Sequence, residues 1–86
     1  MNTSVRNFAA MIITLALRHR FSITSWGRTV KRNRDVGGHD NSRHLLWLAV
    51  DCVFDDMGGY DAFLDDAIRM GLVVILENKD VHIQAP

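Results

Sequence analysis

The sequence predicts one α+β domain over residues 1–86, a small antiparallel sheet flanked by helices. Three observations lead to this prediction. The chain has 86 residues, 48% of them hydrophobic, which is enough for one modest core and too little for a second domain. Two segments repeat apolar residues at helical spacing, and four shorter ones are rich in β-branched or apolar residues. Glycine or polar residues separate these segments, as in a sheet built from short strands.

Helices are expected over about 3–19 and 60–71. Their apolar stripes are Phe8, Ile12, Leu15 and Ala16 in the first and Phe63, Leu64, Ala67 and Ile68 in the second. The first stretch is too short to span a bilayer, so no membrane insertion is expected. The second helix is expected to begin at Asp61 as its N-cap and to end before Gly71, a natural residue for the position after a C-cap.

Strands are expected at "FSITS" (21–25), "LAVDCVF" (48–54), "LVVIL" (72–76) and "VHIQ" (81–84). The third is wholly apolar, which is typical of a fully buried strand. The polar tetrad 77–80 predicts a turn that joins the last two strands in a hairpin. In the second strand, alternation places Cys52 in the core and turns Asp51 to the other face. The long polar stretch 26–43, with Gly37 and Gly38, is a candidate functional loop.

Charge and cysteine content limit the possible functions. The net charge is zero, but residues up to Arg43 carry eight of the ten Lys and Arg, and the later residues carry eight of the ten Asp and Glu. The basic residues are scattered and lack interleaved aromatic residues, so no nucleic-acid partner is expected. The single cysteine, Cys52, excludes an internal disulfide and a multi-cysteine zinc site. Any bound metal must therefore be held by nitrogen and oxygen ligands.

Two histidines and an aspartate are the candidates for such a site. His44 precedes Asp51 by seven positions across an almost wholly apolar run, and His82 lies in the last expected strand. Two imidazoles and one carboxylate form a common ligand set for a catalytic zinc with one open position. The spacing alone also fits ordinary structural roles, because a histidine at a loop end is commonly hydrogen-bonded and an aspartate can cap a neighbouring element.

Four blocks, "ITSWGRT", "NRDVGG", "NSRHLLWLAVD" and "VHIQ", resemble in order the pattern of the zinc D-alanyl-D-alanine carboxypeptidase family and its phage endolysin relatives. That pattern reads approximately ITSGYR, N-x-x-VGG, S-x-H-x-x-G-x-A-x-D and then H-x-H or a related ending. The resemblance implies that His44, Asp51 and His82 bind Zn²⁺. It also implies that Arg28 holds a substrate carboxylate or the polarised carbonyl oxygen, and that Ser42 lines the same pocket.

The general base is one departure from this pattern. Many relatives place a carboxylate three residues before the last zinc histidine, where this chain has Lys79. Two alternatives remain. Asp80 lies two residues before His82, so both side chains emerge on the same face of a strand, whereas Glu77 aligns with the glutamate of relatives that end in E-G-D-H-x-H. Geometry favours Asp80, and both stay open.

The tryptophans are a second departure. Trp47 stands where the family pattern has Gly, and Trp26 stands at the glycine of the first block. An indole at position 47 could fill space beside the zinc or obstruct the substrate channel, which puts activity in question. Trp26 could line a peptide groove or pack on the loop.

The resemblance implies a zinc-dependent peptidase that hydrolyses peptide bonds in peptidoglycan stem peptides, of carboxypeptidase or endolysin type. One alternative is an inactive family member that acts as a binding or structural module. Another is a small regulatory protein that uses its basic loop to bind nucleic acid or an acidic partner. Without a signal peptide, the protein is expected to be made in the cytoplasm and to reach the wall after lysis or as part of a phage. The cleaved bond and the oligomeric state are left open.

Overall fold

The computed structural model describes residues 3–78 and 80–86, so Lys79 lies outside the described residues. The elements, in chain order, are α1 (Val5–Arg18), β1 (Ser22–Ser25), α2 (Val30–Asp35), the 3₁₀ turn η1 (Arg43–Leu46), β2 (Ala49–Val53), the 3₁₀ turn η2 (Met57–Gly59), α3 (Tyr60–Arg69), β3 (Val73–Glu77) and β4 (Asp80–Gln84). The predicted α+β class is confirmed. In the described ranges no helix has the length and apolar character needed to cross a membrane.

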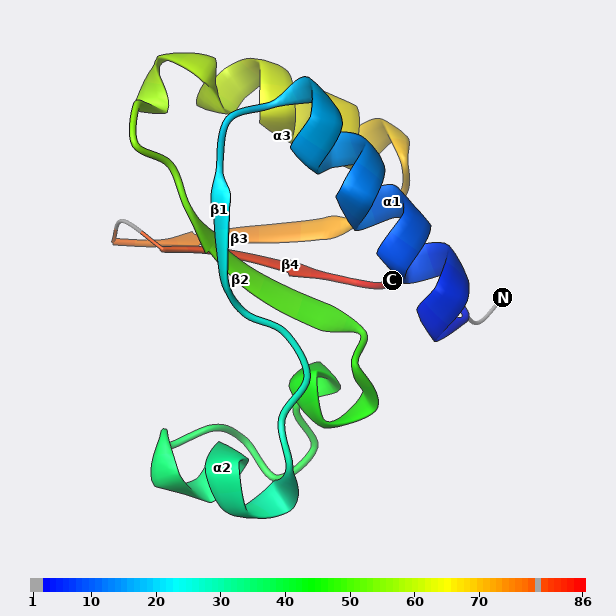
Figure 1. Ribbon diagram of the computed structural model, residues 1–86, viewed down its shortest axis with the longest axis vertical. Coiled ribbons are helices and arrows are strands. Elements are labelled where there is room, and N and C mark those ends of the chain that lie inside the picture. The colour runs from blue at the N-terminus through cyan, green and yellow to red at the C-terminus, as the bar shows by residue number, and fades with distance from the viewer. Residues whose placement is uncertain (1–2, 79) are drawn as a thin grey trace.

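Within the described chain the strands form one four-stranded antiparallel sheet in the order β1-β2-β4-β3. The predicted hairpin is therefore confirmed as β3 and β4. Figure 1 shows α1 and α3 together on one side of the sheet, whereas α2 and the turn before β2 extend beyond the sheet, away from these helices. One face of the sheet thus packs on helices and the other face stays open.

Strand alternation decides which residues face the helices. Val50 and Cys52 of β2 and Val81 and Ile83 of β4 are fully buried in the core with α1 and α3. Burial, then the negative charges of Asp51 and Asp80, raises the pKa of the Cys52 thiol to about 12. The predicted core position of Cys52 is confirmed, and its thiol stays protonated on the helix side. The residues between these core positions in β2 and β4 therefore emerge on the open face.

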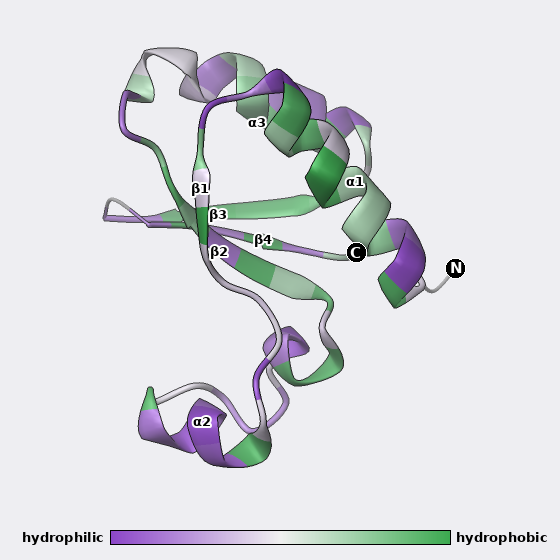
Figure 2. Ribbon diagram, in the orientation of Figure 1, coloured by the Kyte–Doolittle hydropathy of each residue, from purple (hydrophilic) through white to green (hydrophobic). Residues whose placement is uncertain are grey.

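The expectation that residues 72–76 form a fully buried strand is wrong. β3 is an edge strand, and Val73, Ile75 and Leu76 are exposed. Figure 2 shows most of β3 as hydrophobic, up to its hairpin end, even though the strand lies at the edge of the sheet. Apolar composition reports the preference of a segment for burial, but its position in the sheet is set by its pairing with β4.

Glycine residues flank helix α3 at both ends. Its N-cap is Gly59, so the expectation that Asp61 caps the helix is wrong; Asp61 lies in the first turn, where the helix dipole favours a negative charge. At the other end Gly71 has φ +86°, which confirms it as the left-handed residue after the C-cap. Ile68, expected on the apolar stripe, is 59% exposed.

A charged contact ties the end of α1 to α3. Arg18 Nη1 lies 3.0 Å from Asp66 Oδ1, and His19 Nε2 lies 2.9 Å from Asp66 Oδ2. Hydrogen bonds from His19 and then Arg18 hold the pKa of the Asp66 carboxyl below its usual value. The ionised carboxylate is therefore the form that stabilises the packing of the two helices.

The lowered pKa of Asp66 predicts a pH-dependent stability. Because the pKa is lower in the folded chain, the stabilisation is present above the unfolded pKa of about 4 and is lost as the pH falls through the folded value. Asp66→Asn should lower the melting temperature at pH 7, and its difference from the native chain should shrink as the pH falls below the unfolded pKa of about 4. Thermal unfolding followed by circular dichroism measures this. Asp65→Asn, which removes an exposed pair with Arg69, is the control; an equal loss in both variants would contradict the prediction.

Candidate metal centre

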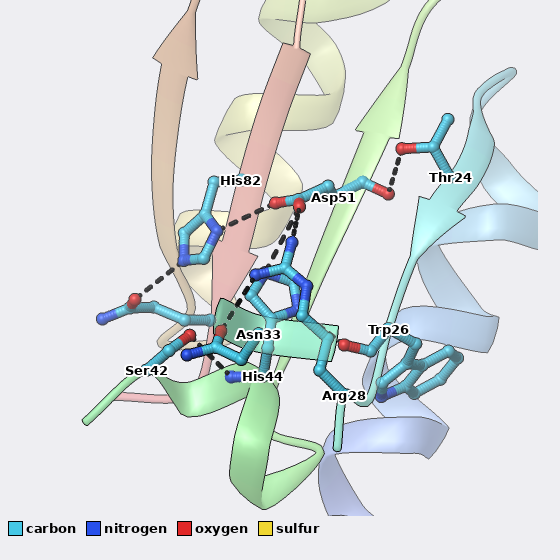
Figure 3. A network of polar contacts seen from close by, with 9 residues as sticks. Thr24, Trp26, Arg28, Asn33, Ser42, His44, Asp51 and His82 are labelled. Carbon is cyan, nitrogen blue, oxygen red and sulfur yellow. Dashed lines mark hydrogen bonds and ion pairs between the residues drawn. The ribbon is translucent and has the colours of Figure 1, made fainter. Parts of the chain in front are cut away.

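The sheet and the turn before β2 bring His44, Asp51 and His82 together. Asp51 is the middle residue of β2 and is the cross-strand partner of His82 in β4, while His44 rises from η1. Asp51 Oδ1 lies 3.0 Å from His82 Nδ1, and Asp51 Oδ2 lies 3.3 Å from His44 Nε2. Figure 3 shows both imidazoles pointing toward the two oxygens of this carboxylate. The three residues that sequence reasoning selected therefore share one site.

This cluster has the chemistry and spacing of a metal site. One ligand atom from each of the three residues lies within 4.8 Å of the others. Ligands bonded to a tetrahedral zinc at 2.0–2.1 Å are separated by about 3.4 Å, and each histidine nitrogen lies at about this distance from one of the two Asp51 oxygens. Two imidazole nitrogens and one carboxylate oxygen are ligands that zinc accepts, so the residues present fit Zn²⁺.

The loop fixes the orientation of His44. Its Nδ1 contacts the backbone carbonyl oxygen of Trp26, and its backbone N–H donates to Ser42 Oγ at 3.2 Å. A carbonyl oxygen only accepts, so Nδ1 donates to it, which leaves Nε2, on the side of Asp51, as the nitrogen that a bound metal would take. The side chain is buried, with 3% exposure. Ser42 therefore lines the site and also holds the backbone of a metal-ligand candidate.

A residue that sequence reasoning missed does the same for His82. Gln84 Oε1 lies 2.8 Å from His82 Nε2. Since an amide oxygen only accepts, Nε2 donates to it, which leaves Nδ1, 3.0 Å from Asp51 Oδ1, as the nitrogen that a bound metal would take. Gln84 lies two residues after His82 on the same face of β4, so strand alternation was a signal that could have identified it.

Arg28 approaches the cluster from the loop between β1 and α2. Its Nη2 donates to Asp51 Oδ2 at 3.0 Å, and its Nη1 lies 3.4 Å from Asn33 Oδ1. Both partners orient the guanidinium, whose side chain is 16% exposed. The positive charge lies beside one oxygen of Asp51, and this ion pair orients the carboxylate in the cluster.

Asn33 is the second residue that sequence reasoning missed, although it begins the "NRDVGG" block. It is buried, and its Nδ2 donates to the carbonyl oxygen of His39 at 2.7 Å. Gly37 has φ +74°, and a Cβ on Gly38 would lie 2.1 Å from Asn33 Oδ1. The two glycines therefore let the loop turn and close on the asparagine that supports Arg28.

The cluster lies in a cavity of about 480 Å³. Its lining includes His44, Asp51 and His82, together with Arg28, His39, Ser42, Arg43, Ile75, Glu77, Asp80 and Gln84. Glu77 and Asp80 are direct cross-strand partners where the β3–β4 hairpin turns. Both candidates for the general base therefore lie on the same wall, and the choice between them stays a prediction.

Trp47 does not lie among the described residues that line this cavity. It has φ +61°, a left-handed conformation that explains why the family pattern has glycine there. Its indole packs over Gly27, where an added Cβ would lie 1.9 Å from Trp47 Cε2. Trp26 packs edge-on against Phe8 and donates from Nε1 to the carbonyl oxygen of Trp47. The Trp47 indole was expected beside the zinc or in the substrate channel, and it lies outside the cavity that contains the metal-ligand candidates.

A solvent-accessible cavity that contains two imidazoles and one carboxylate, on the open face of a small α+β sheet, is the kind of site that metal-dependent hydrolases use. The family model described as Peptidase M15 matches residues 4–84. The chain therefore belongs to the peptidase M15 family, zinc metallopeptidases of the D-alanyl-D-alanine carboxypeptidase type, as the resemblance predicts. No curated protein and no solved structure gives a significant match.

The contact between Gln84 and His82 predicts an effect on metal affinity. Gln84→Met removes the acceptor that orients His82 and should weaken zinc binding about 10- to 100-fold. Gln84→Glu keeps an acceptor and should retain most of the affinity. Competition titration against a chromogenic zinc chelator measures both variants. Equal affinities for the native chain and Gln84→Met would show that the contact does not prepare His82 for the metal.

The contact between Gly27 and Trp47 predicts a coupling in stability. Gly27→Ala forces a methyl group into the rigid indole and should lower the free energy of unfolding by about 1–3 kcal/mol. In a Trp47→Gly background the same change should cost at least 1 kcal/mol less, roughly the coupling expected for residues in contact. Urea unfolding of the native chain, the two single variants and the double variant gives this coupling. Additive effects would contradict the packing described here.

Proposed function

We propose that this protein hydrolyses a peptide bond in peptidoglycan stem peptides as a zinc-dependent peptidase. The observation that carries the proposal is the convergence of His44, Asp51 and His82 on one point of a cavity that also contains carboxylates and a guanidinium. Membership of the peptidase M15 family supports the reaction class and the wall-derived substrate.

The zinc ion and the protein side chains have different roles in the proposed reaction. When bound, zinc supplies a Lewis acid that polarises a carbonyl group and lowers the pKa of water to about 7. Hydrolysis breaks the amide C–N bond: the water oxygen joins the carbonyl carbon, and protons pass to the leaving nitrogen. A carboxylate in the cavity accepts the proton of the attacking water and returns it to that nitrogen. In this proposal Arg28, which donates to Asp51 and lines the cavity, has the role of donor to the developing oxyanion.

Asp80 and Glu77 are the two candidates for this proton transfer. Asp80 shares the open face of β4 with His82, and the residue between them, Val81, is fully buried. Glu77 lies opposite Asp80 across the hairpin and lines the same cavity. We favour Asp80, because its strand also carries one of the metal-ligand candidates. Action on the wall after lysis, or as part of a phage particle, stays a prediction.

The test begins with metal content and turnover. After reconstitution with zinc and gel filtration, elemental analysis should find about one zinc per chain. His44→Ala and His82→Ala should lose it, because two remaining ligands bind zinc weakly. His39→Ala should keep it, since His39 lines the cavity outside the three-residue cluster. Mass spectrometry of diacetyl-L-lysyl-D-alanyl-D-alanine and of purified muropeptides incubated with each protein identifies any product.

The general base is assigned with the same assay. Asp80→Asn should retain zinc and lower kcat by about 10²- to 10⁴-fold, whereas Glu77→Gln should have a much smaller effect. The reverse order would assign the role to Glu77. A native chain that binds one zinc and binds peptide without cleaving it would support the inactive binding module instead. A chain that holds no zinc after reconstitution would contradict the peptidase proposal.

A further inference from the structure

The two edges of the described sheet differ in how they are protected against pairing with another chain. β1, at one edge, reads "SITS", and its register with β2 shifts between Ile23 and Ser25. Natural proteins use polar side chains and local irregularities of this kind to keep an edge strand from pairing. β3, at the other edge, has neither, because residues 72–76 read "LVVIL" and the pairing with β4 continues without a shift from Val73 to Glu77. The outer side of β3 is therefore open to a further strand.

Exposed aliphatic side chains flank β3 on both faces of the sheet. Ile75 pairs with His82 on the open face, and Leu76 pairs with the buried Val81 on the helix face. Val73 and Ile75 are 39% and 41% exposed, and Leu76 is 48% exposed. A strand that paired with β3 would cover apolar surface on both faces at once.

Helix α3 contributes a fourth aliphatic side chain at this edge. α3 packs on β3, and its Asp66 contacts the end of α1, which leads directly into β1 at the opposite edge of the sheet. Successive residues of a helix are about 100° apart, so Ile68 emerges on the flank of α3 that is turned away from α1. Ile68 is exposed on this flank, on the side of the β3 edge. Four residues thus form the β3 edge patch: Ile68, Val73, Ile75 and Leu76.

The pattern of β3 fits a second copy of the same chain that runs antiparallel to it. With Val74 opposite Val74 of the second copy, residues 72–76 pair with residues 76–72, so every opposed side chain is aliphatic. Glu77 and Asp80 of the two copies then lie at opposite ends of the joint sheet. In a parallel pairing these carboxylates would gather at one end and repel one another. Charge therefore selects the antiparallel arrangement, which a two-fold axis generates.

The same pairing limits the assembly to two copies. A two-fold interface uses the β3 edge of both chains and leaves β1 at each outer edge of the joint sheet. β1 is the edge with polar side chains and a shifted register, so further strands are not added there.

We propose that the chain forms a two-fold symmetric dimer through antiparallel pairing of its β3 edges. A two-fold axis perpendicular to the joint sheet keeps both open faces on one side, so the two candidate metal centres face the same way. Ile75 and Glu77 line the cavity. Val73 of the second copy lies directly opposite Ile75 and extends this wall, so each copy adds an aliphatic side chain beside the other copy's site. The inference does not depend on the proposed peptidase activity.

Sedimentation velocity of the zinc-loaded chain, from about 5 to 500 µM, tests the association. One short strand and four side chains per copy make a small interface, so the dimer should form at the upper concentrations and dissociate on dilution. Val73→Lys/Leu76→Lys places two lysines on the edge and should stay monomeric throughout. Ile13→Lys/Leu17→Lys, the same change of charge at two exposed positions of α1, is the matched control and should dimerise like the native chain.

Disulfide cross-linking tests the register without a change of charge. A mixture of Val73→Cys and Ile75→Cys chains should give a disulfide-linked dimer on mild oxidation, because these positions face each other with Cα atoms about 4.5–5.5 Å apart. Each variant alone should give none. The buried Cys52, with its pKa raised to about 12, should not react.

The outcomes separate the alternatives. A native chain that sediments as a monomer at every concentration overturns the proposal and leaves the β3 edge to a strand of another protein. Dimers that persist in Val73→Lys/Leu76→Lys, or that only the α1 variant loses, overturn it by placing the interface elsewhere. Cross-links in a single cysteine variant, or none in the mixture, overturn the register. Larger assemblies of the native chain overturn the limit of two copies.

Discussion

The carboxylate of Asp51 is the interaction on which the site depends. Its two oxygens contact His82, His44 and Arg28, residues that come from β4, η1 and the loop after β1. These contacts attach η1 and the loop after β1 to the sheet, in addition to the strand pairing that already joins β2 and β4. The same carboxylate is a metal-ligand candidate, so the group that organises the fold of the open face also organises the chemistry.

Asp51 can do this because β2 serves two environments at once. Val50 and Cys52 face the helices and are fully buried, and Asp51 between them faces the cavity. A strand in the interior of the sheet is the most restrained part of the fold, since it is hydrogen-bonded on both sides. Placing the carboxylate there limits its movement, while the histidine from η1 is adjusted by backbone contacts of the loop.

Sequence pattern and family resemblance predict the arrangement of the strand residues Asp51 and His82 better than the contacts that support the loop residues His44 and Arg28. Alternation in β2 and β4 places Asp51 and His82 on one face, and the register of the two strands makes them neighbours. The supports of His44 and Arg28 are a backbone carbonyl of Trp26 and the buried side chain of Asn33. Such contacts join residues through the path of an irregular loop, which no local periodicity encodes. The edge position of β3 was missed for a similar reason, because pairing partners are set by the whole sheet.

The aromatic departures from the family pattern have one physical explanation. The pattern has glycine at 26 and 47 and tyrosine at 27, whereas this chain has Trp26, Gly27 and Trp47. The indole of Trp47 occupies the space into which a side chain at 27 would project, and Trp26 donates to the carbonyl of Trp47. A glycine at 27 is therefore the condition that admits an indole at 47, despite the left-handed backbone there. The two tryptophans keep aromatic side chains beside the loop that carries Arg28. Trp47 does not line the cavity, so tryptophan in place of glycine at position 47 changes the packing that supports the site and does not fill the cavity.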